Sequence, residues 1–116
     1  MEDRQMYEKT IMALIAHGGD ARSFALQAVE AARKGDFLKA DELLKDSRQA
    51  FADAHEVQTA LISDEVSGKS VPITLLMMHA QDHIMNAESI YDLGCQIVEL
   101  CRQLDLNRQQ QRRKQN

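Results

Sequence analysis

The chain is poor in the residues that build sheets and turns. It contains no Trp, three Phe and two Tyr, so aromatics make up 4% of its 116 residues, and it has only one Pro and five Gly. Sheets of short strands need frequent Gly- and Pro-rich turns, so this scarcity favours a few long helices. At this length we expect one domain with a small core of Leu, Ile, Val, Ala and Met.

Cysteine is also scarce. Cys95 and Cys101 are six residues apart on one expected helix, which places them on different faces and too far apart for a disulfide. Free thiols suit a reducing compartment. We expect no secretory signal after Met1, and no apolar run approaches the roughly 18 residues of a membrane span. These features together predict a cytoplasmic protein.

Positive charge is concentrated at one end of the chain. Of the 14 basic residues, four lie in the Gln-rich tail 107–116, which has no acid, so the remainder carries 10 basic and 18 acidic residues. An acidic body argues against nucleic acid as the main ligand. The tail is able to touch an anionic surface, but we interpret it as a frayed, solvated helix end outside a domain that spans 1–106.

Apolar residues recur at three- and four-residue spacing over three long segments, at about 3–34, 36–66 and 72–104. This periodicity predicts three amphipathic helices. Short turns between long helices force antiparallel neighbours. The expected fold class is therefore all-α, an antiparallel three-helix up-down-up bundle.

The few glycines and the single proline predict where the helices begin and end. Gly18-Gly19 should kink or break the first helix, because two glycines cost about 2 kcal/mol in a helix interior. Asp20 can then cap the helix where it resumes. Gly35 suits a helix stop, Asp36 suits the next N-cap, and Pro72 suits the first turn of the third helix.

The first half of the third segment is more apolar than two neighbouring helices can cover. Its apolar residues occupy more than one core-facing stripe, and Leu75 and Met78 lie outside the main one. Surplus apolar surface of this kind is typical of an interface. Because cyclic homo-oligomers are the common solution, we expect copies of the chain to associate through this helix.

The most informative residues lie within this apolar segment. His79, Asp82 and His83 stand at i, i+3 and i+4 in the otherwise uncharged run 71–87, so on a helix they project from one side. Burying a carboxylate costs several kcal/mol unless it is paired or bound to a metal. The pattern therefore indicates a site.

Each of these side chains has a chemical and a plain interpretation. Neutral imidazole is nucleophilic near pH 7, so His79 suits phosphoryl transfer through a phosphohistidine, although a histidine can also simply pack at a helix edge. Asp82, meeting its own copies at an interface, would need a shared cation such as Mg²⁺, or it forms a salt bridge to a residue such as Arg22.

His83 is a hydrogen-bonded core histidine or a residue that orients His79. A zinc site on the His-x-x-Asp-His pattern is the weaker alternative, because three ligands on one helical turn rarely converge on one metal. Gln81 and Asn86 are candidate hydrogen-bond partners or plain surface residues. His17, placed to interact with a helix C-terminus, and His55 are expected to pack or cap.

Several stretches together resemble one known family. They cover about residues 5–105 and leave the basic tail outside: Gly19-Asp20-Ala21-Arg22-Ser23, Lys34-Gly35-Asp36-Phe37, Ala54-His55-Glu56-Val57-Gln58-Thr59, His79-Ala80-Gln81-Asp82-His83 and Glu99-Leu100. The chain resembles the lactose/cellobiose-type enzyme IIA component of the bacterial phosphoenolpyruvate-dependent sugar phosphotransferase system.

The resemblance implies a trimer of three-helix bundles that acts as a phosphotransferase component. His79 would accept a phosphoryl group from the histidine phosphocarrier protein and pass it to a cysteine of enzyme IIB. Asp82 would meet its two copies on the threefold axis, where a divalent cation, usually taken as Mg²⁺, relieves their repulsion. The sugar would bind a membrane enzyme IIC. Lactose and cellobiose/chitobiose branches share the motif, so the sugar is not specified.

Two other functions are compatible with the helical pattern. One is a helical interaction or adaptor protein that retains the bundle alone. The other is a histidine phosphotransfer domain of two-component signalling, which usually has a Lys near the reactive histidine, whereas no Lys lies near His79. The donor of the phosphoryl group distinguishes these functions, because an adaptor would accept none.

Overall fold

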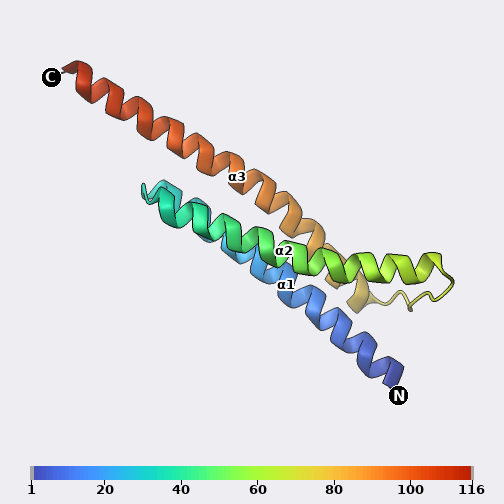
Figure 1. The fold of residues 1–116 in the computed structure, drawn as a ribbon. Coiled ribbons are helices and arrows are strands. Elements are labelled where there is room, and N and C mark those ends of the chain that lie inside the picture. The colour runs from blue at the N-terminus through green and yellow to red at the C-terminus, as the bar shows by residue number, and fades with distance from the viewer. Residues whose placement is uncertain (1, 116) are drawn as a thin grey trace.

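The chain forms three long helices. The computed structural model describes residues 2–115, with side chains from Arg4 onward, and contains α1 (Glu2–Arg33), α2 (Phe37–Val66) and α3 (Leu75–Gln115). No strand occurs among these residues, and the predicted all-α class is confirmed. Figure 1 shows the helices lying alongside one another, with α3 projecting beyond the turn that joins α1 to α2.

The turn between α1 and α2 follows the sequence prediction. Gly35 has φ +84°, a left-handed conformation that glycine adopts at little cost, and it lies two residues after Arg33, the last residue of α1. The Asp36 side chain then accepts a hydrogen bond from the Lys39 backbone N–H at 3.2 Å and so caps α2. A reversal of three residues, Lys34 to Asp36, makes α2 the direct neighbour of α1.

The predicted break at Gly18-Gly19 is wrong. α1 continues through both glycines, so Asp20 lies inside the helix and does not cap it. A Cβ atom built on Gly18 would lie 3.2 Å from the backbone carbonyl carbon and oxygen and from the Cβ of His83. The missing side chain therefore allows α3 to approach α1 closely, and this packing offsets the low helix propensity of glycine.

The start of α3 also differs from the prediction. Pro72 lies before the helix, in an extended connection, and α3 begins at Leu75. Thr74 takes the capping position: its Oγ1 accepts from the Met77 N–H at 3.1 Å and its carbonyl accepts from the Met78 N–H at 3.0 Å. A threonine that satisfies a free N–H at the helix start supplies the cap that a proline cannot.

Contacts along the helices define their directions. The buried Ser47 hydroxyl of α2 donates to the Ala21 carbonyl of α1 at 2.6 Å, whereas Ala54, further along α2, packs with the earlier residue Leu14. α1 and α2 are therefore antiparallel. α3 runs parallel to α1, because His83 faces Gly18 and the later residue Gly94 faces Ala25.

α1 is the central helix of the molecule. It contacts α2 and α3 to a similar extent, whereas α2 and α3 meet over a much shorter length. Small residues keep these interfaces close, and the buried alanines of α1 are Ala21, Ala25, Ala28, Ala31 and Ala32. Since α1 covers only one side of α3, the opposite side of α3 is left without a neighbour.

That uncovered side carries an apolar stripe. Leu75, Asp82, Leu93 and Leu100 are separated by seven, eleven and seven residues, which are close to whole helical turns, so they share one face of α3. Leu75, Leu93 and Leu100 are 84%, 59% and 55% exposed. We call these four residues the outer stripe of α3. It confirms that this helix has more apolar surface than the chain itself covers.

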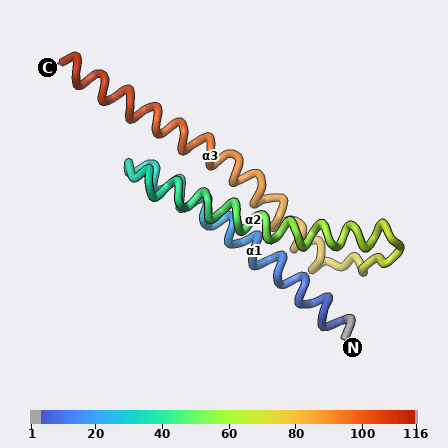
Figure 2. The backbone as a smooth tube through the Cα atoms, viewed as in Figure 1, coloured from blue at the N-terminus to red at the C-terminus, as the bar shows by residue number. Residues whose placement is uncertain are grey.

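The end of α3 is helical rather than frayed. The helix continues through residues 107–115, and Gln109 Nε2 donates to Asp105 Oδ2 at 3.0 Å. Arg112, Arg113 and Lys114 occupy the last turn, where positive charge stabilises the partial negative charge of the free carbonyls. The chain trace in Figure 2 shows this end standing clear of α1 and α2 in a molecule that measures 72 × 21 × 20 Å. Within the described residues, no helix is apolar enough over a sufficient length to cross a bilayer.

Candidate functional site

The start of α3 is held in place by α1. The Tyr7 hydroxyl donates to the Pro72 carbonyl at 2.6 Å and lies 3.2 Å from Thr74 Oγ1, the cap of α3. These bonds tie two segments that are 65 and 67 residues apart in the sequence. They fix the first turns of α3, which carry His79. His79, the predicted nucleophile, is thus an exposed side chain near the anchored first turn of α3.

The two histidines of the motif contact each other. His79 Nε2 and His83 Nε2 lie 3.1 Å apart, and the rings meet edge to face with centroids 4.6 Å apart at 84°. In such a contact one nitrogen carries the proton and the other offers its lone pair. His83 is half-buried and its backbone packs against Gly18, so it is a rigid neighbour for the exposed His79 ring.

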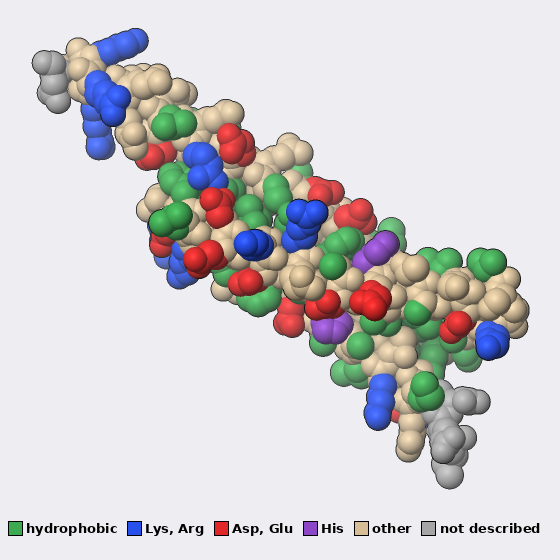
Figure 3. All heavy atoms as spheres, viewed as in Figure 1, with side chains coloured by type: hydrophobic (Ala, Val, Ile, Leu, Met, Phe, Trp, Pro, Cys, Tyr) green, Lys and Arg blue, Asp and Glu red, His purple; other side chains and the backbone are tan. Residues whose placement is uncertain are grey.

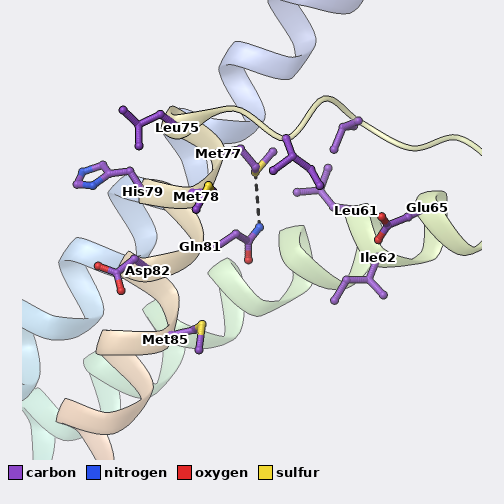
Figure 4. A pocket seen from close by; sticks show the side chains of 12 residues that line it. Leu61, Ile62, Glu65, Leu75, Met77, Met78, His79, Gln81, Asp82 and Met85 are labelled. Carbon is purple, nitrogen blue, oxygen red and sulfur yellow. Dashed lines mark hydrogen bonds between the residues drawn. The ribbon is translucent and has the colours of Figure 1, made fainter.

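Asp82 projects from the same side of α3 as His79, away from Met77 and Gln81 (Figure 4). Its Oδ2 accepts a hydrogen bond from Asn86 Nδ2 at 3.2 Å, so Asn86 is a partner within the motif. Among the residues that the structure describes, no ion pair joins Asp82 to Arg22, and no group of three His, Cys, Asp or Glu side chains is arranged to hold a metal. One copy of the chain therefore contributes a single carboxylate here.

Gln81 points toward α2. Its Oε1 accepts from Gln58 Nε2 at 2.7 Å, and its Nε2 lies 3.6 Å from Met77 Sδ, the contact drawn in Figure 4. The first contact joins α3 to α2, and the second lies within α3. Of the two residues predicted to assist the site, the structure brings His83 to His79 and places Gln81 on the α2 side.

A wide apolar hollow adjoins the histidine. It has a volume of about 710 Å³ and lies between the end of α2, the connection that follows and the start of α3. Leu61, Ile62 and Ile73 form its walls, and Met78 and His79 belong to its lining. The contribution of α2 to this hollow was not predicted, because nothing in the periodicity of the sequence shows that this part of α2 extends beside the connection.

The other two histidines are remote from the motif. His55 is exposed and stacks on Phe51 of the same helix, with ring centroids 5.9 Å apart, so its predicted packing role is confirmed. His17 lines a separate hollow between α1 and α2 together with Asp53 and Glu56. Because α1 is unbroken, the prediction that His17 interacts with a helix C-terminus is wrong.

Both cysteines are free thiols, as the sequence predicted. Cys95 lies beside Tyr91, and the pKa of Tyr91 is raised above its ordinary value of 10.0, first by partial burial and next by the hydrogen bond to the Cys95 thiol. The charge of Arg48 acts in the opposite direction. This group stands on α3 two to three turns beyond the histidine pair and is not part of the site.

The arrangement suits transfer of a small charged group. A neutral imidazole with its ring exposed can attack an electrophile through the nitrogen that carries no proton. A second imidazole at hydrogen-bond distance can supply the N–H of the contact, so that the attacking nitrogen keeps its lone pair. The apolar hollow beside it offers a surface for a partner that delivers such a group. His79 and His83 are the side chains of this site that such chemistry would use.

Comparison with known proteins gives consistent matches. Residues 9–102 match a family model described as the lactose/cellobiose-specific IIA subunit of the PTS system. The lichenan-specific phosphotransferase enzyme IIA component of Bacillus subtilis (strain 168) is 44% identical over 93 residues, which cover 80% of this chain and 84% of that protein. A lactose-specific EIIA component of Lactococcus lactis subsp. lactis is 41% identical over 87 residues, covering 75% of this chain and 83% of that protein.

Solved structures agree with the sequence matches. The cellobiose-specific enzyme IIA from Bacillus anthracis superposes with a TM-score of 0.84 at 37% identity, covering 85% of this chain and 91% of that one. The IIA(Chitobiose) protein in its complex with HPr from the Escherichia coli phosphotransferase system gives a TM-score of 0.74 at 36% identity, covering 84% of this chain and 95% of that one.

Proposed function

Since this chain belongs to the lactose/cellobiose-specific enzyme IIA family of the phosphotransferase system, we propose that it relays phosphoryl groups in the cytoplasm during sugar uptake. It accepts the group from the histidine phosphocarrier protein and passes it to enzyme IIB, which serves the membrane enzyme IIC. The solved complex of the similar chitobiose protein with HPr supports the first partner. The observation that carries the proposal is the exposed His79 ring paired with His83 at the edge of an apolar hollow.

In the proposed step His79 is the nucleophile. A lone pair of its neutral imidazole forms an N–P bond while the N–P bond to the phosphocarrier breaks, and the released electron pair returns to the carrier histidine. A loose transition state of this kind needs positioning and charge stabilisation more than acid-base chemistry. His83 acts as a positioning residue, because its Nε2–H can donate to His79 Nε2 at 3.1 Å and so favour the neutral His79 tautomer that has its proton on Nδ1 and its lone pair on Nε2.

The active unit that we propose is a homotrimer of up-down-up bundles. The outer stripe of α3 supports it, because an exposed row of leucines interrupted by Asp82 is the pattern expected for a helix that packs against copies of itself. Cyclic symmetry about an axis parallel to α3 would cover Leu75, Leu93 and Leu100 in all three chains at once. It would also bring the three Asp82 side chains together.

A divalent cation fits this arrangement. Carboxylate oxygens are ligands that Mg²⁺ prefers, and the exposed Asp82 already has its orientation set by Asn86. One carboxylate per chain is too few for a site, so three copies of Asp82 would hold the ion together. When bound, it would neutralise carboxylates that otherwise repel one another. Its role would be structural, since His79 rather than Asp82 carries the phosphoryl group.

The relay is tested by incubating the chain with phosphoenolpyruvate, enzyme I and the phosphocarrier protein and measuring its intact mass. The wild type should gain one phosphoryl group, and His79→Ala should gain none while keeping its helical circular dichroism spectrum. His55→Ala is the matched control, because His55 is also exposed but lies on α2, and it should be labelled normally. Labelling of His79→Ala would refute the assignment, and labelling of the wild type by a response regulator alone would favour two-component signalling.

The trimer and its cation are tested together by light scattering. Asp82→Leu should remain trimeric and become insensitive to chelator, because three repelling carboxylates are replaced by apolar contacts. The wild type should lose mass or thermal stability when a chelator removes the cation. A monomeric Asp82→Leu variant would show that the metal is needed to hold the chains together, and a wild type that is monomeric with the cation present would refute the trimer.

A further inference from the structure

The strongest charged patch lies at the far end of α3, remote from the histidine site. Arg108, Arg112, Arg113 and Lys114 follow the last acidic residue of the chain, Asp105, and all four are exposed. Figure 3 shows these Lys and Arg side chains gathered at one tip of the molecule. We call them the basic tip.

The last turn of the basic tip, which carries Arg112, Arg113 and Lys114, is electrostatically separate from the acidic body. At 1.5 Å of rise per residue, Arg112 and Lys114 lie about 10 and 14 Å beyond Asp105, which exceeds the Debye length of about 8 Å in physiological salt. The carboxylates of the body therefore do little to cancel the positive charge of the last turn. An anionic partner can approach the tip without being repelled by the rest of the chain.

The distribution of the four cations favours a broad surface as the partner. They are spread around the circumference of the helix rather than along one face, since residues 112, 113 and 114 differ by about 100° each. A linear polyanion lying along the rod would meet the acidic body, whereas a plane touched end-on would meet the tip alone. We infer that the basic tip docks onto the anionic headgroups of a lipid bilayer.

The helical state of the tip supports this contact. Because the segment 107–115 is already ordered as a continuation of α3, docking does not require its backbone to be ordered. The number of cations per contact depends on the trimer that forms part of the proposed function. Cyclic symmetry about an axis along α3 would place three basic tips at the same end, and clustered basic residues near an anionic leaflet add their attractions.

Docking would also set the distance between the site and the membrane. His79 lies 33 residues before Arg112 on one continuous helix, which corresponds to about 50 Å along the axis. An upright rod would hold the histidine well clear of the headgroups and accessible to soluble partners. The established family role says nothing of such a contact, and phosphoryl transfer in solution does not require it.

The test is sedimentation of the full chain with vesicles. The wild type should co-sediment with mixed phosphatidylcholine/phosphatidylglycerol vesicles at physiological salt, and not with phosphatidylcholine alone or at high salt. Arg112→Gln/Arg113→Gln/Lys114→Gln should bind the anionic vesicles on the order of 100-fold more weakly, because each cation near an anionic surface contributes several-fold. Glutamine keeps the helix propensity close to that of Arg and Lys.

A matched control separates the tip from overall charge. Lys9→Gln/Lys45→Gln/Lys69→Gln removes the same three charges from exposed positions on the body and should bind vesicles as the wild type does. Equal weakening by both triple variants, or no sedimentation of the wild type, would overturn the proposal. Tighter tip-dependent binding to duplex DNA at equal anion concentration would overturn it in favour of nucleic acid.

Phosphoryl uptake and oligomeric mass are measured on the same samples. Loss of vesicle binding by the tip variant with normal uptake and trimer mass is the expected result. A tip variant that keeps vesicle binding refutes the inference alone, whereas failure of the wild type to accept a phosphoryl group refutes the relay alone.

Discussion

Gly18 and Gly19 are adjacent glycines in the same helix, and the structure gives them opposite roles. A Cβ atom on Gly18 would meet three atoms of His83 at 3.2 Å, two of them in the α3 backbone, whereas a Cβ atom on Gly19 would meet nothing within 4 Å. Backbone atoms of a packed helix cannot move aside individually. We therefore expect Gly18→Ala to force α1 and α3 apart and Gly19→Ala to be accommodated freely.

The two substitutions share a gain in helix propensity, but only Gly18→Ala carries a cost of overpacking. Each replaces a mid-helix glycine by alanine, which should add about 0.8–1 kcal/mol to the free energy of unfolding through helix propensity. Overpacking at Gly18 should cost about 1–3 kcal/mol. Gly19→Ala should thus be more stable than the wild type, and Gly18→Ala should be less stable than Gly19→Ala by the full overpacking cost.

Thermal unfolding followed by circular dichroism measures this difference. For a chain of this length 1 kcal/mol corresponds to roughly 4 °C in Tm, so the two variants should melt about 4–12 °C apart. Chain concentration must be equal in all samples, because association of copies would raise Tm with concentration. Two variants that melt together above the wild type would refute the claim that Gly18 sets the approach of α3. Gly18→Ala should also slow phosphoryl uptake, since the displaced residue is His83.

Two further substitutions test individual contacts. Thr74→Ala should lower the free energy of unfolding by about 1 kcal/mol through loss of the α3 cap, whereas Thr74→Ser should retain the cap. Urea unfolding measures both variants, with the exposed Thr59→Ala as control. Equal free energies of unfolding for all three variants would contradict the assignment. Tyr91→Phe tests the raised pKa of Tyr91: the unfolded chain loses the phenol proton at a lower pH than the folded chain, so this contribution to stability is complete below pH about 10 and declines as pH rises above it. The Tyr91→Phe variant should lose less stability than the wild type above pH 10. Equal losses would show that the raised pKa of Tyr91 does not contribute to the pH dependence.

The helices were predictable because their information is local. Three long periodic segments, a left-handed Gly35 and a capping Asp36 each act within a few residues, and the structure confirms all of them. The start of α3 was misplaced for a different reason. Pro72 is a legitimate first-turn residue in isolation, but Tyr7, 65 residues earlier, binds its carbonyl and holds the connection extended up to the Thr74 cap.

The glycine pair shows the limit of propensity most clearly. Propensity counts both glycines as helix breakers, yet α1 continues because one of them permits a contact with α3 that only the tertiary structure reveals. The site was predicted in part. Helical spacing correctly placed His79 and His83 on one side of the helix, and Asn86, one of two candidate hydrogen-bond partners, forms a hydrogen bond with Asp82. It gave no indication of the hollow beside His79, whose walls come from α2.

The central position of α1 has a consequence for folding order. The α1–α2 hairpin closes through a three-residue turn, so its contacts are local and should form early, whereas α3 packs mainly on α1 across the whole length of α2 in the sequence. Docking of α3 should be the last step, and α3 should be the first unit released by partial unfolding. His79 is positioned only when that step is complete. The capacity to accept a phosphoryl group would then report on the finished fold, and a chain that has formed only the α1–α2 hairpin would accept none.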